Sequence, residues 1–289
     1  MRRDPLAHLR SLPYLGVGLG YRKELDASIR ANRSSIDCLE IISEHYFDAT
    51  PDRIARLTSL AEEFPLIPHG IEMSIGTVGE VDPAYLSSLA HVTSIARGAW
   101  ASDHLSFTRA GGIALGQLTP LVRDCAMAID IARKAQAVQD RLGVPFLLEN
   151  VSYYVNFTSE LTEAEFIAEI MSRCTCGMLL DLTNLFLNSR NHGYDPLQFL
   201  ETIPLDRVVQ IHLAGGDSKE HQMGDVLLDL HGAAVYEESF KLLDYVAPRA
   251  ANLRSVIIER DQNFPEDFGE ILADLDRARQ IVSQVRRAA

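Results

Sequence analysis

The sequence predicts an α/β fold, a single (β/α)₈ barrel in which eight parallel strands alternate with helices. Three observations favour this fold. Eight short apolar runs recur along the chain, helical patterns separate them, and most of the runs end on His, Asp or Glu. Because the carboxyl ends of barrel strands meet at one mouth, polar residues placed there converge. A length of 289 residues suits one barrel, so we expect a single catalytic domain over residues 1–289.

The predicted strands are continuous apolar runs, as expected for parallel strands that are buried on both faces. They are residues 14–20, 36–42, 66–70, 100–107, 146–150, 177–181, 208–213 and 255–260. The first run ends in GVGLG (16–20), whose glycine spacing misses the dinucleotide-binding pattern G-x-G-x-x-G. A doubly wound nucleotide-binding sheet is therefore disfavoured.

Helical patterns follow the strands, and several start with a proline after a capping residue. The predicted helices are residues 22–32, 51–63, 83–97, 120–141, 160–173, 196–203, 235–247 and 265–286. The longest, 120–141, is expected to begin at Pro120 with Thr119 as N-cap and to stop before Gly143. The connections 182–194 and 214–234 are expected to be long loops that build a substrate pocket.

Composition limits the partners of the protein. A formal net charge of −13 disfavours a nucleic-acid backbone as ligand, because that surface would repel it. No apolar run approaches the length of a membrane span, so no membrane association is expected. The four cysteines show no disulfide spacing, which indicates a reducing compartment. We therefore expect a cytoplasmic protein.

The strand ends carry the candidate chemistry, because buried carboxylates and imidazoles are costly unless they converge on a partner. Eight residues are candidate metal ligands: His69, His104, Glu149, Asp181, His212, Asp229, His231 and Glu259. Eight ligands are too many for one ion, so two or three ions are expected. Imidazole and carboxylate donors without thiolates suit iron, manganese or zinc. No catalytic residue beyond these ligands is predicted.

Five further residues are candidates for metal binding or for supporting the ligands. They are Glu44, Asp103, Asn150, Asn184 and His192. Other interpretations remain open at this level. His69 could be a hydrogen-bonded residue that closes a layer of the barrel, Glu149 could pair with an Arg or Lys, and Glu44 could lie in a solvated loop.

As a set, ten short motifs resemble the multinuclear non-heme iron-dependent oxidative enzymes, the family that includes the methanobactin-biosynthesis iron oxidase. The motifs are GVGLG (16–20), SEHY (43–46), HG (69–70), SDHL (102–105), LLEN (147–150), LLDLTN (179–184), RNHGYDP (190–196), IHLAGG (211–216), LLDLHG (227–232) and IIERD (257–261). They occur in order between about residues 14 and 275.

The resemblance implies a xylose-isomerase-like TIM barrel with two or three irons in a mixed-valence Fe(II)/Fe(III) state. It implies that the eight candidate ligands hold the irons and that dioxygen is used to oxidise a residue, often cysteine, of a ribosomally made precursor peptide. It also implies a separate partner protein that binds the leader of that peptide. Asn184 matches a position where family members hold Asn or His, and Asp103 stands where Glu is common.

Two other classes remain as alternatives. The first is a different TIM-barrel metalloenzyme, either a sugar isomerase or a trinuclear zinc hydrolase. An isomerase would need a lysine near the metals, which no predicted strand carries, and a nuclease would need a basic groove. The second is a binding or metal-storage protein without catalysis, which oxygen consumption with a candidate peptide would distinguish.

Overall fold

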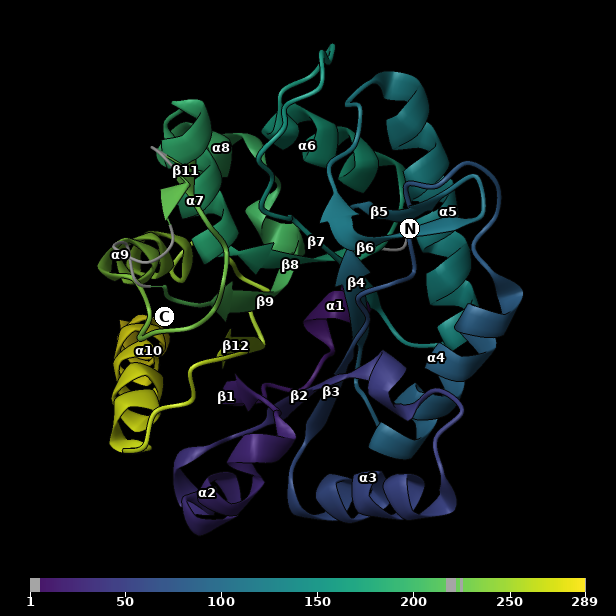
Figure 1. The fold of residues 1–289 in the computed structure, drawn as a ribbon. Helices are drawn as coiled ribbons and strands as arrows, with labels where there is room; N and C mark the ends of the chain where they lie inside the picture. The colour runs from purple at the N-terminus through teal and green to yellow at the C-terminus, as the bar shows by residue number, and fades with distance from the viewer. Residues whose placement is uncertain (1–5, 217–221, 224–225, 289) are drawn as a thin grey trace.

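The computed structural model describes residues 6–216, 222–223 and 226–288, and its centre is a closed barrel of eight parallel strands (Figure 1). The order around the barrel is β1–β12–β9–β8–β7–β4–β3–β2. The strands are β1 (Gly16–Gly20), β2 (Leu39–Ile42), β3 (Leu66–His69), β4 (Ala101–His104), β7 (Phe146–Glu149), β8 (Gly177–Asp181), β9 (Val208–Leu213) and β12 (Ser255–Ile258). The predicted fold class is confirmed, and each barrel strand falls inside a predicted run.

Helices surround the barrel on its outside (Figure 1). They are α2 (Asp26–Ala31), α3 (Pro51–Glu63), α4 (Pro83–Ala96), α5 (Cys125–Leu142), α6 (Glu163–Arg173), α7 (Leu182–His192), α8 (Pro196–Thr202), α9 (Glu237–Val246) and α10 (Gly269–Ala288). Short 3₁₀ turns lie at Lys23–Leu25, Arg33–Ser35, Ser43–Tyr46 and Leu205–Arg207. Among the described residues, no helix has the length and apolar character needed to cross a membrane.

The predicted start of the longest helix is wrong. Residues before it form an antiparallel hairpin of β5 (Phe107–Ala110) and β6 (Ile113–Thr119), so Thr119 ends a strand instead of capping a helix. Gly111 and Gly112 make the turn at positive φ, which glycine tolerates without strain. Helix α5 begins at Cys125, where the side chain of Asp124 accepts a hydrogen bond from Met127 N.

The prediction of a long loop over 182–194 is also wrong, because this segment is helix α7. The side chain of Asp181 caps it by accepting a hydrogen bond from Asn184 N at 2.7 Å. The other expected loop, 214–234, lies partly outside the described residues. Its described part contains the short strands β10 (Gln222–Met223) and β11 (Val226–Leu227). Helix α6 likewise starts later than expected, at Glu163, after a capping box made by Thr162 and Glu165.

The interior of the barrel contains an apolar cluster toward the amino ends of the strands. Its members are Leu6, Leu9, Cys38, Ile67, Trp100, Leu147, Leu179, Val209 and Ile257. Leu6 precedes the short helix α1 (Ala7–Arg10) and Leu9 lies in it, so this helix packs against the inner cluster. The larger apolar core lies between the strands and the outer helices. The carboxyl end of the interior is left to polar side chains.

Candidate metal centre

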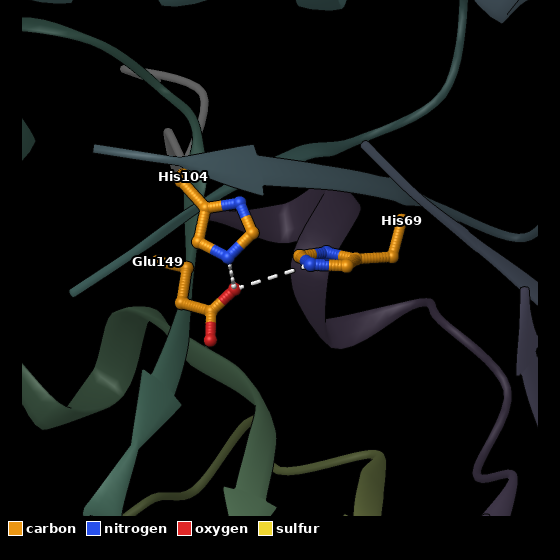
Figure 2. A group of neighbouring side chains, drawn as sticks. All are labelled: His69, His104 and Glu149. Carbon is orange, nitrogen blue, oxygen red and sulfur yellow. Dashed lines mark ion pairs between the residues drawn. The ribbon is translucent and has the colours of Figure 1, made fainter. Parts of the chain in front are cut away.

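Three residues from neighbouring strands form the first group of candidate ligands (Figure 2). The Nε2 atoms of His69 and His104 lie 3.4 and 3.3 Å from Oε2 of Glu149. Nδ1, the other nitrogen of each ring, contacts a protein oxygen atom. Nδ1 of His69 lies 2.9 Å from Ser102 Oγ, and Nδ1 of His104 lies 3.2 Å from the carbonyl oxygen of Gly70. Both rings therefore present Nε2 to Glu149.

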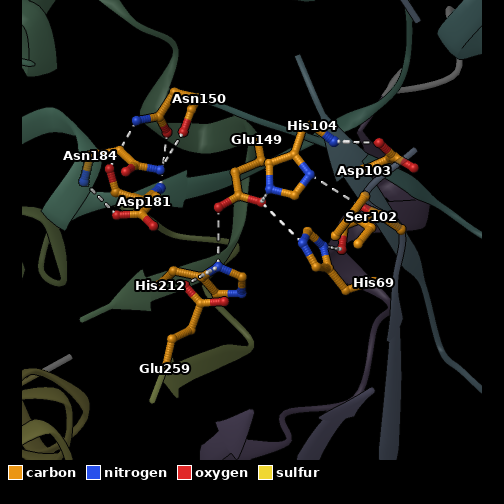
Figure 3. A network of polar contacts seen from close by, with 12 residues as sticks. His69, Ser102, Asp103, His104, Glu149, Asn150, Asp181, Asn184, His212 and Glu259 are labelled. Atoms are coloured by element: carbon orange, nitrogen blue, oxygen red, sulfur yellow. Dashed lines mark hydrogen bonds and ion pairs between the residues drawn. The ribbon is translucent and has the colours of Figure 1, made fainter. Parts of the chain in front are cut away.

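A second group shares Glu149 with the first (Figure 3). Its other members are Asp181, His212 and Glu259, and each residue offers a donor atom within 4.8 Å of the others. Nδ1 of His212 lies 3.1 Å from Glu149 Oε1 and 3.2 Å from Glu259 Oε2. Each carboxylate oxygen of Glu149 thus faces a different group, which is the arrangement a carboxylate needs to bridge two ions.

Asp229 and His231 lie beside the second group. Nε2 of His231 is 2.6 Å from Asp229 Oδ1, and its Nδ1 is 3.4 Å from Glu259 Oε2. We expected this pair to meet because residues two apart in an extended segment point the same way. The two side chains do meet, although His231 has a positive φ of 46° and is not extended.

The donor set fits a metal cluster. Among the described residues, two buried polar atoms in this region, Oδ2 of Asp181 and Oδ1 of Asn184, have no hydrogen-bond partner. A buried polar atom without such a partner is unfavourable, and native proteins contain few of them. Two such atoms beside crowded carboxylates and imidazoles fit a site for cations, and the residue types suit a hard or borderline metal ion.

The pKa values of three imidazoles, His69, His212 and His231, shift in different directions. Burial lowers the pKa of His69 well below its usual value, and the nearby His104 and His212 lower it further. Burial also opposes protonation of His212 and His231. However, the surrounding carboxylates, with Glu259 facing both rings, raise the pKa of each well above its usual value. Protons therefore supply positive charge where carboxylates crowd, and metal ions that bind there would displace them.

The carboxylates respond to the same crowding. Burial, with Glu149 and Glu259 nearby, raises the pKa of Asp181 well above its usual value. For Glu259, burial acts in the same direction but is outweighed by His212 and His231, which hold its pKa well below the usual value. These opposite shifts reflect how closely the buried carboxylates and imidazoles are packed at this site.

Sequence reasoning missed Glu40, which lies inside the barrel on β2 and is 3% exposed. Its Oε2 lies 3.0 Å from Nε2 of His212 and accepts a hydrogen bond from Gln210 Nε2. Gln210 in turn accepts a 2.7 Å bond from the indole N–H of Trp100. A signal existed: Glu40 is an acid between Leu39 and Ile41, two residues after the inward-facing Cys38. That signal lies in the interior of a strand, whereas the predicted ligands stand at or beyond strand ends.

Glu44 and Asp103 lie outside both ligand groups and bind protein atoms instead. The hydroxyl of Tyr85 lies within hydrogen-bond distance of both carboxylates. Glu44 also accepts bonds from the backbone N–H groups of Ile71 and Glu72, at 2.7 and 2.8 Å. Asp103 accepts one from the backbone of His104. These two acids fix the segment that follows β3, which forms part of the cavity wall.

The remaining candidates divide between the site and its surroundings. Asn150 binds the backbone of Asp181 through both ends of its amide, at 2.9 Å each. Asn184 lines the cavity and keeps its buried Oδ1 without a hydrogen-bond partner. His192 lies outside both ligand groups, where its Nε2 contacts Tyr153 O at 2.8 Å and its ring stacks on Tyr153.

A cavity of about 530 Å³ opens onto the candidate ligands. Its wall includes His69, His104, Glu149, Asn184, Asp229, His231 and Glu259, together with Ala114, Gly116, Gln117 and Leu118 of the hairpin. Two arginines also line it, Arg22 and Arg109, and each is paired with an acid, Asp261 and Glu72 respectively. Six of the eight candidate ligands thus line the cavity, whereas Asp181 and His212 are fully buried beside it.

The sequence profile of the family described as "RiPP precursor modification enzyme MbnB/TglH/ChrH" matches residues 16–283. The chain belongs to this family. Its members modify ribosomally synthesised precursor peptides, so the chain is placed among enzymes that take a precursor peptide as substrate. The match covers the whole barrel and every candidate ligand.

The chain is similar to curated proteins that are named UPF0276 protein. One from Anaeromyxobacter sp. (strain Fw109-5) is 36% identical over 268 residues, covering 92% of this chain and 93% of the relative. Another, from Caulobacter vibrioides (strain NA1000 / CB15N), is 35% identical over 281 residues, covering 96% and 98%.

Solved structures with the same fold are distant in sequence. D-psicose 3-epimerase from Clostridium cellulolyticum H10 superposes with a TM-score of 0.59 at 13% identity, covering 94% of this chain and 98% of that chain. Endonuclease IV from Thermus thermophilus gives 0.55 at 18% identity, covering 94% and 100%. At these identities the likeness extends to the barrel fold alone.

Proposed function

We propose that this protein is a multinuclear non-heme iron enzyme that uses dioxygen to oxidise a cysteine of a ribosomally synthesised precursor peptide. The observation that carries the proposal is the shared carboxylate of Glu149, which lines the cavity and faces two histidine-carboxylate groups. Membership of a family of precursor-peptide modification enzymes supports the choice of substrate. The resemblance of the sequence motifs to iron-dependent oxidative enzymes supports the choice of metal.

The proposal assigns ligands as follows. His69, His104 and Glu149 would hold one ion, and Glu149, Asp181, His212 and Glu259 a second. Asp229 and His231, which meet Glu259, would hold a third together with Asn184. A mixed-valence set of two or three irons would pass electrons from the peptide cysteine, which is oxidised, to dioxygen, which is reduced.

The residues around the cluster bind and orient. Ser102 and the carbonyl of Gly70 fix the rings of His69 and His104, so both present the same nitrogen to the cluster. The hairpin β5–β6 forms one wall of the cavity and limits the access of water to the ligands. A cavity of about 530 Å³ has room for a few residues of a peptide but not for a folded domain.

The first experiment is purification under anaerobic conditions, followed by metal analysis and an oxygen-consumption assay. We expect at least one iron per chain. We also expect oxygen uptake with a Cys-bearing peptide encoded beside the gene, together with a mass change in that peptide. The matched control is the same peptide with its cysteine replaced by serine, which should not change in mass. Conversion that persists without oxygen, or less than one iron per chain, would contradict the proposal.

Two further parts of the proposal concern context. We propose that a separate protein binds the leader of the precursor peptide and that the reaction takes place in the cytoplasm. Co-purification of the chain with the product of a neighbouring gene would test the first, and fractionation of the producing cell would test the second.

A further inference from the structure

The three histidines of the two ligand groups do not present the same ring nitrogen. His69 and His104 face Glu149 with Nε2, whereas His212 faces Glu149 and Glu259 with Nδ1. For each ring, a protein group lies on the opposite nitrogen. The hydroxyl of Ser102 contacts His69 Nδ1, and the carbonyl oxygen of Gly70 contacts His104 Nδ1. The carboxylate of Glu40 contacts His212 Nε2. Among these three rings, His212 is thus the one whose far nitrogen faces a carboxyl group.

From this geometry we infer that Glu40 is a positioning residue for His212. It accepts the Nε2 proton of the imidazole, so that Nδ1 keeps a lone pair directed at the second metal position. The contact is 3.0 Å long, and both side chains are buried. A carboxylate on the far nitrogen of a metal-binding imidazole fixes its tautomer and raises its basicity. The inference rests on the metal-binding part of the proposed function.

Gln210 and Trp100 hold the carboxylate of Glu40 in place. The indole N–H of Trp100, on the residue before β4, donates to Gln210 Oε1, which directs the amide nitrogen of Gln210 toward Glu40. That amide nitrogen also lies 2.9 Å from Nε2 of His212. An amide N–H group has no lone pair with which to accept the Nε2 proton, so the carboxylate is the acceptor. The charged pair is also the stronger of the two interactions.

The two ligand groups therefore depend on different supporting residues. Removal of Glu40 should affect the ion held by Asp181, His212 and Glu259, and should leave the ion at His69 and His104 in place. Ser102 gives the converse case, since it contacts His69 and no member of the second group. Outer partners of metal-binding histidines typically change metal affinity by about 10- to 100-fold.

The experiment uses the full chain reconstituted anaerobically with ⁵⁷Fe(II), with iron content and Mössbauer spectra as readouts. His69→Ala and Asp181→Ala serve as references that empty the first and the second position. Glu40→Leu should lose about one ion per chain and give the spectrum of Asp181→Ala. Glu40→Gln keeps the acceptor but not the charge, so it should retain that ion with about ten-fold weaker affinity. Ser102→Ala should weaken the first position only.

Each other outcome overturns the inference. A folded Glu40→Leu chain with the full iron content and the wild-type spectrum would show that Glu40 does not position His212. Complete loss of the ion in Glu40→Gln would make Glu40 a ligand instead, and equal loss from both positions would make it a general structural residue. Thermal unfolding of each variant verifies folding, and the near-isosteric Glu40→Gln decides the matter if Glu40→Leu does not fold. A wild-type chain that binds no iron would overturn the proposed function as well.

Discussion

The interior of the barrel contains two layers of side chains that come from the same strands yet differ in chemistry. The lower layer, toward the amino ends, is apolar, and the upper layer consists of acids and histidines. The strand pairs are Cys38 and Glu40, Ile67 and His69, Leu147 and Glu149, Leu179 and Asp181, and Ile257 and Glu259. Because side chains alternate along a strand, a step of two residues keeps the inward direction and moves up one layer.

In this barrel the apolar layer stabilises the fold, and the polar layer above it holds the candidate ligands. Burial of the lower layer removes apolar surface from water and stabilises the fold. The upper layer is equally buried, but it crowds carboxylates together, which disfavours folding unless cations join them. The upper layer lies at the carboxyl mouth of the barrel, the end at which barrel enzymes place their active sites. The following predictions test this division, from the largest expected effect to the smallest.

Replacement of Glu149 by Ala should have the largest effect, because this residue belongs to both ligand groups. We expect iron to be lost from both positions and peptide oxidation to fall by more than about 100-fold, beyond the effect typical of residues that only orient ligands. Metal analysis and the peptide assay measure the two results. Glu80→Ala, at an exposed surface pair with Arg133, is the matched control. Full iron content in Glu149→Ala would contradict the division between layers.

Replacement of Ile257 by Ala, one layer below Glu259, should destabilise the protein and leave the ligands in place. Ile257 is 0% exposed, and such a truncation typically costs about 2–5 kcal/mol of unfolding free energy. Chemical denaturation measures the loss, and iron content under native conditions should stay at the wild-type level. Val78→Ala provides the control, since Val78 is 93% exposed and should change stability little. If Ile257→Ala lost iron without losing stability, the apolar layer would contribute to metal binding, which would contradict the division between the layers.

Glu163 shows the behaviour of a buried carboxylate away from the ligand layer. Burial raises its pKa to about 7, although the Arg123 guanidinium opposes this. Because the folded pKa lies above the unfolded value, the contribution of this group to stability is fully present below about pH 4.5 and is lost as pH rises through 7. Glu163→Gln should therefore unfold at a higher temperature than the wild type at pH 8, and this advantage should shrink toward pH 5. A difference in unfolding temperature that stays constant from pH 5 to pH 8 would contradict the raised pKa of Glu163.

The smallest effect is expected for Asp124→Ala, which removes the cap of α5 at a distance from the ligands. The loss should be about 1 kcal/mol of unfolding free energy with unchanged iron content. Asp181→Ala removes a cap of the same kind from α7, but it should also remove iron. Thermal unfolding and metal analysis of the two variants separate the capping role from the ligand role. Equal iron content in both would argue against Asp181 as a ligand.

The sequence predicted the barrel because eight buried strands leave a strong apolar signal. It also predicted six residues that the fold brings into two groups: His69, His104, Glu149, Asp181, His212 and Glu259. These residues stand at or near strand ends, where polar residues contrast with the apolar run before them. The placement of ligands at one mouth follows from the fold class alone.

Other features left weaker signals. The hairpin β5–β6 is short and largely exposed, so it lacks an apolar pattern, although Gly111–Gly112 marked a turn. Helix α7 contains Asn184, Asn188 and Asn191, and asparagine favours turns over helix interiors when tertiary contacts are ignored. The ring nitrogen that each histidine presents could not be predicted, because it depends on partners such as Ser102 and Glu40 from other strands.

Asp181 has a consequence for which substitutions the chain can accept. Its carboxylate starts helix α7 through Asn184 N and also belongs to the second ligand group. Asparagine or serine would still begin the helix but would bring no negative charge, while the longer glutamate would bring the charge but reach past the amide that it must meet. Of these residues, only aspartate can both cap helix α7 and offer a carboxylate to the second ligand group. We therefore expect position 181 to tolerate fewer substitutions than the rest of helix α7.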